Sequence, residues 1–106
     1  MFRMFAIGLT GALAVLSATA FAQDLGNPAR GQRVAETICS ECHAIQKGAT
    51  RSTNANAPTF ERVAKTPGMN AMALRVWLRS QHKEMPNIML KDEQVDDVIA
   101  YVQTLK

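Results

Sequence analysis

The chain has 106 residues, enough for one small domain, and a formal net charge of +3. Its basic residues are scattered among acidic ones and only three aromatic residues follow residue 22, so the composition argues against a nucleic-acid-binding protein. A domain of this size usually completes its core with a disulfide, a metal or a large cofactor, because its own apolar residues are few.

Residues 1–22 have the pattern of a secretory signal peptide. Arg3 gives the N-terminus a positive charge, residues 5–18 are apolar, and residues 20–22 form a small-x-small cleavage site. We expect cleavage after residue 22, which leaves a domain at 23–106 with 84 residues and a formal net charge of +2 in the bacterial periplasm. An uncleaved membrane anchor is the alternative, although the apolar segment is short for a span of about 20 residues.

The first predicted helix of the domain leads directly into a cysteine motif. Pro28 suits an early helical position, and small or apolar residues recur at helical spacing up to Cys39. These residues are Gly31, Val34, Ala35 and Ile38. The missing side chain at Gly31 would let another helix cross very close to this one, and a tolerated surface glycine is the alternative.

Residues 39–43 read Cys-Ser-Glu-Cys-His, the C-x-x-C-H sequence to which haem is covalently attached. Each of the two sulfurs, on Cys39 and Cys42, can add across one haem vinyl group, and the two intervening residues place both along one edge of the porphyrin. His43 then lies under the ring, where its imidazole can reach the iron. We therefore predict His43 as the proximal iron ligand.

Three other kinds of site use similar residues. A structural disulfide between Cys39 and Cys42 suits an oxidising compartment, and a thioredoxin-like redox pair has the same spacing. Neither explains His43, and the redox pair normally lies next to a βαβ pattern, of which we find no sign in the sequence. A zinc site would need His82 as its fourth ligand, and the adjacent Cys42 and His43 are poorly placed around one tetrahedral ion.

A loop and two helical segments are expected after the motif. Residues 44–57 have no apolar period and many polar residues, which favours a surface loop. Residues 60–65 are expected to form a short helical turn with Thr59 as its N-cap. A Pro-Gly break at residues 67–68 precedes a helix predicted from an Asn70 N-cap to Gln81. The residues that this helix is expected to bury are Leu74, Trp77 and Leu78.

The iron of an electron carrier needs a sixth ligand that closes the position to oxygen, and a thioether favours the reduced iron. Met85 is the main candidate, because Pro86 cannot continue a helix and an irregular segment can project the methionine inward. Met89 and His82 are the rival ligands, and His82 also suits a solvated or capping role at a helix end. The methionines interpreted as fillers of the core are Met69, Met72 and Met89.

The chain is predicted to end in an amphipathic helix. Its apolar stripe at positions i, i+3, i+4 and i+7 is formed by Val95, Val98, Ile99 and Val102, with Tyr101 and Leu105 beside it. Negative charges gather in its first turns, where the helix dipole favours them. The acidic residues are Asp92, Glu93, Asp96 and Asp97.

From about Gly26 to its end, the chain resembles the class I cytochromes c. The elements that carry the resemblance are Gly31 eight positions before Cys39, the C-x-x-C-H of residues 39–43, Pro58, Trp77-Leu78, Met85-Pro86 and the Asp-Val-Ile-Ala-Tyr of residues 97–101. The resemblance implies an all-α fold with three to four helices around one covalently attached haem c, and a close crossing of the first and last helices near Gly31 and Tyr101.

The resemblance also implies the roles of the site residues. His43 and Met85 would be the axial ligands of the iron, and the Pro58 carbonyl would accept a hydrogen bond that fixes the His43 ring. Trp77 is expected in the core or in the wall of the haem pocket.

Two features depart from the family pattern. The segment between Leu78 and Met85 is shorter than in the mitochondrial-type proteins, so the methionine side of the haem is expected to be more exposed. Ala35 stands where many members carry an aromatic residue, so the helix crossing is expected to pack less bulk.

Together these features predict a periplasmic one-electron carrier rather than an enzyme. Its donor and acceptor would be redox proteins such as a dehydrogenase, an oxidase or another cytochrome, and the chain would be a monomer or a subunit of a small redox complex. It is similar to short bacterial cytochromes, some of which accept electrons as subunits of periplasmic dehydrogenases. The alternative is a haem protein with a displaceable sixth ligand, acting as a sensor or a small haem enzyme.

Basic residues near the predicted haem edge suggest how a partner is attracted. Arg75, Arg79 and Lys83 are four residues apart, and Lys47 and Arg51 lie in the preceding loop. Such a strip would steer an acidic partner at low salt, and a merely solvated helix face is the alternative.

Overall fold

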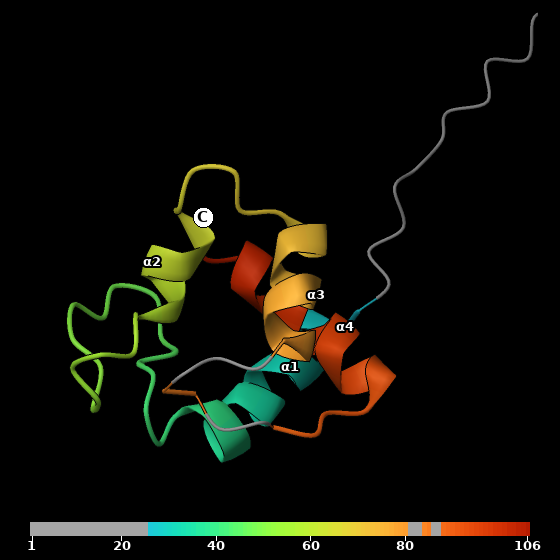
Figure 1. Cartoon of the computed structure of the whole chain (residues 1–106), viewed down its shortest axis with the longest axis horizontal. Helices are drawn as coiled ribbons and strands as arrows, with labels where there is room; N and C mark the ends of the chain where they lie inside the picture. The colour runs from blue at the N-terminus through green and yellow to red at the C-terminus, as the bar shows by residue number, and fades with distance from the viewer. Residues whose placement is uncertain (1–25, 81–83, 86–87) are drawn as a thin grey trace, which may run out of the picture.

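The computed structural model describes residues 26–80, 84–85 and 88–106 of the chain. The helices in this part are α1 (Pro28–Val34), the π-helical η1 (Ala35–Cys39), α2 (Phe60–Ala64), α3 (Ala71–Arg79) and α4 (Asp92–Gln103). Figure 1 shows α1, α3 and α4 gathered on one side and α2 with the long loop on the other. The described residues contain no strand, and the predicted all-α fold is confirmed. The predicted signal peptide lies outside the described residues.

The first helix changes its winding before it delivers the cysteine motif. The side chain of Asn27 caps α1 by accepting from the Arg30 amide at 2.9 Å, and Pro28 occupies the first turn. From Ala35 onward the winding widens, and the Ser40 amide donates to the Ala35 carbonyl five residues back at 2.9 Å. The sequence pattern predicts one regular helix over this stretch, so the change of winding was not expected. Such π-type turns re-aim the following residues and are frequent at functional sites.

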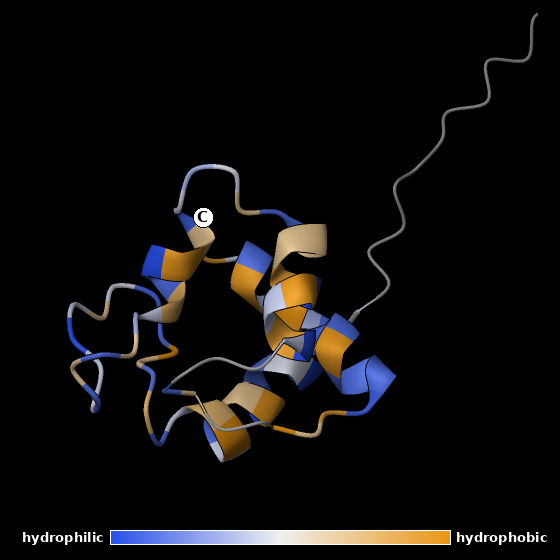
Figure 2. Ribbon diagram, in the orientation of Figure 1, coloured by the Kyte–Doolittle hydropathy of each residue, from blue (hydrophilic) through white to orange (hydrophobic). Residues whose placement is uncertain are grey.

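The two middle helices begin where their capping residues predict. Thr59 Oγ1 accepts from the Arg62 amide at 3.1 Å at the start of α2, and Asn70 Oδ1 accepts from the Ala73 amide at 2.8 Å at the start of α3. The last helical residue of α3 is Arg79, two positions before the predicted end. Hydrophilic and hydrophobic residues alternate around α3 and α4, as Figure 2 shows, so both helices turn one face inward.

The first and last helices cross at Gly31, as predicted. A Cβ atom at Gly31 would lie 1.8 Å from the carbonyl oxygen of Asp97 and 2.9 Å from the Cβ of Tyr101. The Gly26 position is equally close, because a Cβ there would lie 2.0 Å from the carbonyl oxygen of Asp96. Only a residue without a side chain allows the α1 and α4 backbones to approach to this distance.

A buried carboxylate fastens the same crossing. Asp97 on α4 accepts from the Asn27 amide at 2.7 Å, from Arg30 Nε at 2.9 Å and from Arg30 Nη2 at 3.2 Å. These bonds stabilise the charged form, so the Arg30 guanidinium holds the pKa of Asp97 below its usual range although burial opposes it. The charge pattern of the last helix does not distinguish Asp97 from the other acidic residues near the helix start.

The core lies between the helices and includes residues of the long loop. Every member of the predicted α4 stripe is buried, and Tyr101 and Leu105 beside it are buried as well. Ala35 is fully buried, so a small residue fills the position beside the crossing. The loop after the motif was predicted to lie at the surface, but two of its residues are buried. Ile45 is 5% exposed and Ser52 is 8% exposed.

Two side chains of α3 that were predicted to be buried are exposed. Leu74 is buried and Leu78 is partly buried, but Trp77 is 55% exposed and so does not belong to the core. Met72 is 76% exposed, which rules out the predicted role of core filler, whereas Met69 does pack against the core.

The described residues contain no helix that is both long and apolar enough to span a membrane.

Candidate functional site

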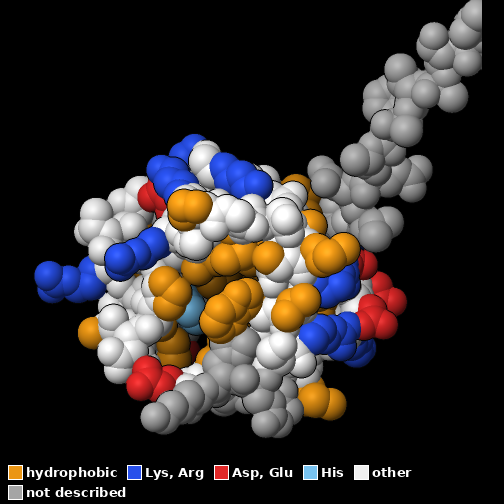
Figure 3. Space-filling model, turned by 45° about the horizontal axis from the view of Figure 1, so that its top comes forward, with side chains coloured by type: hydrophobic (Ala, Val, Ile, Leu, Met, Phe, Trp, Pro, Cys, Tyr) orange, Lys and Arg blue, Asp and Glu red, His pale blue; other side chains and the backbone are white. Residues whose placement is uncertain are grey.

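A cavity of about 780 Å³ opens beside the cysteine motif. Its walls come from the motif itself, from the loop before α2, and from α2, α3 and α4. The apolar side chains in these walls include Phe60, Val63, Leu74, Leu78, Ile99 and Val102. This volume lies within the range of about 300–1,000 Å³ that is typical of sites for small molecules and cofactors. Figure 3 shows a hollow ringed by hydrophobic side chains, with a histidine visible inside it.

Both cysteines of the motif line this cavity. Cys39 is 8% exposed and Cys42 is partly buried, and both are free thiols. Burial raises the pKa of the Cys39 thiol to about 11. A catalytic redox cysteine needs a lowered pKa, because the thiolate is the nucleophile. The environment of Cys39 therefore argues against the thioredoxin-like alternative.

The ring of His43 is held in one orientation by a backbone carbonyl. Its Nδ1 lies 2.6 Å from the carbonyl oxygen of Pro58. Because a carbonyl only accepts, Nδ1 carries the hydrogen, and in the neutral ring Nε2 then has the lone pair that can bind a metal ion. The Phe60 ring lies beside the imidazole, with 5.5 Å between the ring centroids. The contact that the resemblance implies between His43 and Pro58 is present.

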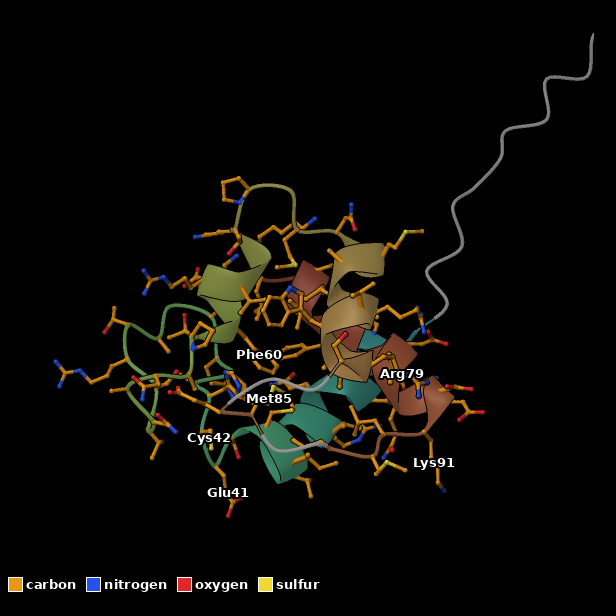
Figure 4. All side chains as sticks on the ribbon, viewed as in Figure 1. Glu41, Cys42, Phe60, Arg79, Met85 and Lys91 are labelled. Carbon is orange, nitrogen blue, oxygen red and sulfur yellow. The ribbon has the colours of Figure 1, made fainter. Side chains whose placement is uncertain are left out.

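Met85 is a partly buried side chain in the wall of the same cavity. Figure 4 labels it near Phe60 and Cys42. The rival ligand Met89 is 88% exposed and is not among the residues that line the cavity, so it is neither a core filler nor placed to reach an iron there. The other rival, His82, lies outside the described residues.

Trp77 lines the cavity although it is half-exposed. It therefore belongs to the wall of the site and to the surface at once. Within the described residues, no three His, Cys, Asp or Glu side chains are grouped to hold a metal ion. The zinc alternative depends on His82, of which the structure gives no description.

The comparison with known proteins decides the family. The family model for cytochrome c matches residues 28–106. The chain belongs to the cytochrome c family. A protein described as cytochrome c-552, from Bradyrhizobium diazoefficiens, is 31% identical over 100 residues, which span 94% of this chain and 92% of that protein. No solved structure matches the chain significantly.

Membership of the cytochrome c family implies electron transfer by a covalently bound haem c with iron. The residues present fit this group. Cys39, Cys42 and His43 line an apolar cavity large enough for a cofactor, and Met85 lies in its wall. Nδ1 of His43 is bound to the Pro58 carbonyl, which leaves Nε2 as the ring nitrogen available to a metal ion. The side chains around this cytochrome site are thus those that covalent attachment and two axial ligands require.

The charges around this cytochrome site differ from the prediction. Arg75 forms an ion pair with Asp96, and Arg79 forms one with Asp92, so both α3 arginines are paired to α4. Lys83 lies outside the described residues. The predicted basic strip on α3 is therefore wrong for its two described members, because sequence spacing does not show which carboxylates a neighbouring helix brings close.

Positive charge gathers instead on the other side of the cavity, in what we call the basic lobe, residues 44–70. It contains four basic residues and one acidic residue, namely Lys47, Arg51, Arg62, Lys65 and Glu61. Glu61 accepts from Lys65 Nζ at 3.1 Å and from the Gly48 amide at 3.0 Å, and these bonds lower the pKa of Glu61. Figure 3 shows Lys and Arg side chains beside and above the hollow, and Arg62 belongs to its lining.

Proposed function

We propose that the chain is a monohaem c-type cytochrome that carries one electron at a time between redox proteins in the periplasm. The observation that carries the proposal is the convergence of Cys39, Cys42, His43 and Met85 on one apolar cavity. Met85 lies 42 positions after His43 in the sequence, so only the fold brings it to the motif.

Each residue has a defined task in this proposal. The Cys39 and Cys42 sulfurs would hold one haem through thioether bonds, and His43 Nε2 and the Met85 sulfur would be the ligands of its iron. Pro58 keeps the histidine in the tautomer and orientation that ligation needs. The bound haem supplies the one-electron chemistry, and the apolar walls keep water from the iron.

Export and partners follow from the pattern outside and around the site. The signal-peptide pattern of residues 1–22 supports cleavage and a periplasmic location. Partners would be a donor and an acceptor among periplasmic redox proteins, including a dehydrogenase of which the chain could be a subunit. Trp77, half-exposed in the cavity wall, would lie where a haem edge and a docked partner approach each other.

Replacing Met85 by alanine tests the carrier against the alternative of a displaceable sixth ligand. In the oxidised wild-type protein we expect a sulfur-to-iron charge-transfer band, measured by absorption spectroscopy. Met85→Ala should abolish this band and leave high-spin iron that binds added ligands. Among the described residues, the other methionine in the cavity wall is Met69, which lies before α3 and not in the segment that follows it.

Met89→Ala is the matched control, because Met89 lies four residues further on and is 88% exposed. It should leave the band unchanged. A wild-type protein with high-spin iron and no such band would favour the sensor or small haem enzyme, and loss of the band in Met89→Ala alone would assign the ligand to Met89.

We also propose that the basic lobe attracts an acidic partner. The charges of Lys47, Arg51 and Arg62 appear in no ion pair among the described residues, whereas the α3 arginines are paired to α4. A concentration of unpaired positive charge beside the cavity favours the approach of a negative surface.

The rate of electron transfer to hexacyanoferrate(III), an anionic probe, tests this steering. At an ionic strength of about 0.1 M, Arg62→Gln should lower the second-order rate about twofold, because one charge near the cavity acts on a trivalent anion within about one Debye length. Arg33→Gln on α1 removes the same charge from another exposed site and should change the rate little. Equal slowing in both variants would show that only net charge matters.

A further inference from the structure

The backbone that follows the proximal histidine is held from several sides. The Ala44 amide donates to Ser52 Oγ at 3.0 Å, and the Ala44 carbonyl accepts from the Phe60 amide at 2.9 Å. The His43 amide donates to the Cys39 carbonyl at 2.9 Å. These bonds connect the segment to the motif, to its own loop and to α2, but not to the last helix.

Tyr101 supplies the connection to the last helix. Its hydroxyl donates to the Ile45 carbonyl at 2.6 Å, across 56 positions of sequence, and the bond is buried. Burial raises the pKa of the Tyr101 phenol, so the group stays a protonated donor at physiological pH. A buried carbonyl without a donor is unfavourable, because it has lost its hydrogen bonds to water. The bond therefore fixes the place of Ile45 relative to α4.

Aromatic rings form a second connection, which links Tyr101 to His43 through Phe60. The Phe60 ring lies between the other two, with centroid distances of 5.5 Å to His43 and 6.4 Å to Tyr101 and interplanar angles of 56° and 50°. Phe60 is 7% exposed and Tyr101 is 6% exposed, so these rings have little room to move. Tilted aromatic pairs at these distances are favourable contacts.

From this geometry we propose that Tyr101 is a positioning residue for the proximal ligand. It reaches His43 twice, through the backbone at Ile45 and through the Phe60 ring, and so holds the imidazole against the Pro58 carbonyl. The inference rests on the proposed function, in which His43 binds the haem iron. In this way α4, which contributes no iron ligand, controls the orientation of one.

The hydrogen on His43 Nδ1 reports this positioning directly. It exchanges with solvent only when its bond to Pro58 opens, so its exchange rate in the haem-loaded, reduced, full-length protein can be followed by proton NMR. Tyr101→Phe keeps the ring against Phe60 and removes only the hydroxyl. We expect this variant to retain its haem and to exchange the Nδ1 hydrogen at least tenfold faster than the wild-type protein.

Val95→Ala is the control for a general loss of stability. Val95 is a fully buried residue of α4 that does not line the cavity, and its truncation adds no charge. The two variants are compared at temperatures equally far below their melting points. Phe60→Leu interrupts the ring contact while keeping the backbone bond to Ala44, and should give a smaller acceleration than Tyr101→Phe.

The outcomes separate this inference from the proposed function. Faster exchange in Tyr101→Phe than in Val95→Ala supports the positioning role, and equal exchange in both overturns it while the haem and its ligands stand. A wild-type protein without covalent haem overturns the proposed function and this inference with it. In the oxidised protein, the hyperfine shifts of the His43 ring protons should change in Tyr101→Phe and not in Val95→Ala.

Discussion

Replacing both Cys39 and Cys42 by alanine is expected to yield a chain without covalent haem that does not fold cooperatively. The reason is the apolar cavity of about 780 Å³, whose walls would face water without haem. A large apolar side chain left in water instead of being buried forfeits about 1.5–3 kcal/mol. Several such side chains amount to much of the stability of a small domain, about 5–15 kcal/mol. Far-UV circular dichroism during heating measures the result.

The control keeps both sulfurs and changes the motif between them. Glu41 is exposed between the two cysteines, so Glu41→Ala should attach haem and melt as the wild-type protein does. A haem-free Cys39→Ala, Cys42→Ala variant that melts in one cooperative transition would show that the apolar residues alone support the fold. The cofactor would then be an addition to a stable domain rather than a part of its core.

Replacing Gly31 by alanine is expected to destabilise the haem-loaded protein by more than about 3 kcal/mol. At an exposed helical position the same change would stabilise by about 1 kcal/mol, because alanine is the better helix former. Here the added Cβ would lie 1.8 Å from the Asp97 carbonyl oxygen, which belongs to backbone and cannot rotate away. Helices α1 and α4 would have to separate. Denaturant unfolding followed by circular dichroism measures the loss.

Gly48→Ala is the matched control for this change. Gly48 has a φ of +84°, and a Cβ there would meet nothing within 4 Å. Its replacement should cost only the strain of a left-handed conformation, about 1–2 kcal/mol. If the loss at Gly31 were no larger than the loss at Gly48, the crossing would not depend on close contact between the two helices.

Sequence patterns determined the helices and the chemistry of the motif. Capping residues such as Thr59 and Asn70 act on amides three residues away, and the spacing of Cys39, Cys42 and His43 is set within one turn. Such features are local, so their physical effects can be read without knowing the fold. The apolar stripe of α4 was equally informative, because a helix presents residues at this spacing on one face.

Only the tertiary structure decided which groups meet across long distances in sequence. The pattern of α3 showed an amphipathic helix, but not that Arg75 and Arg79 would be paired to α4 or that Trp77 would remain half-exposed. No sequence pattern around Tyr101 or around Ile45 predicted the hydrogen bond between them. The physical reason is that periodicity shows how apolar a face is, whereas the partner that covers it depends on how closely and at what point the helices cross.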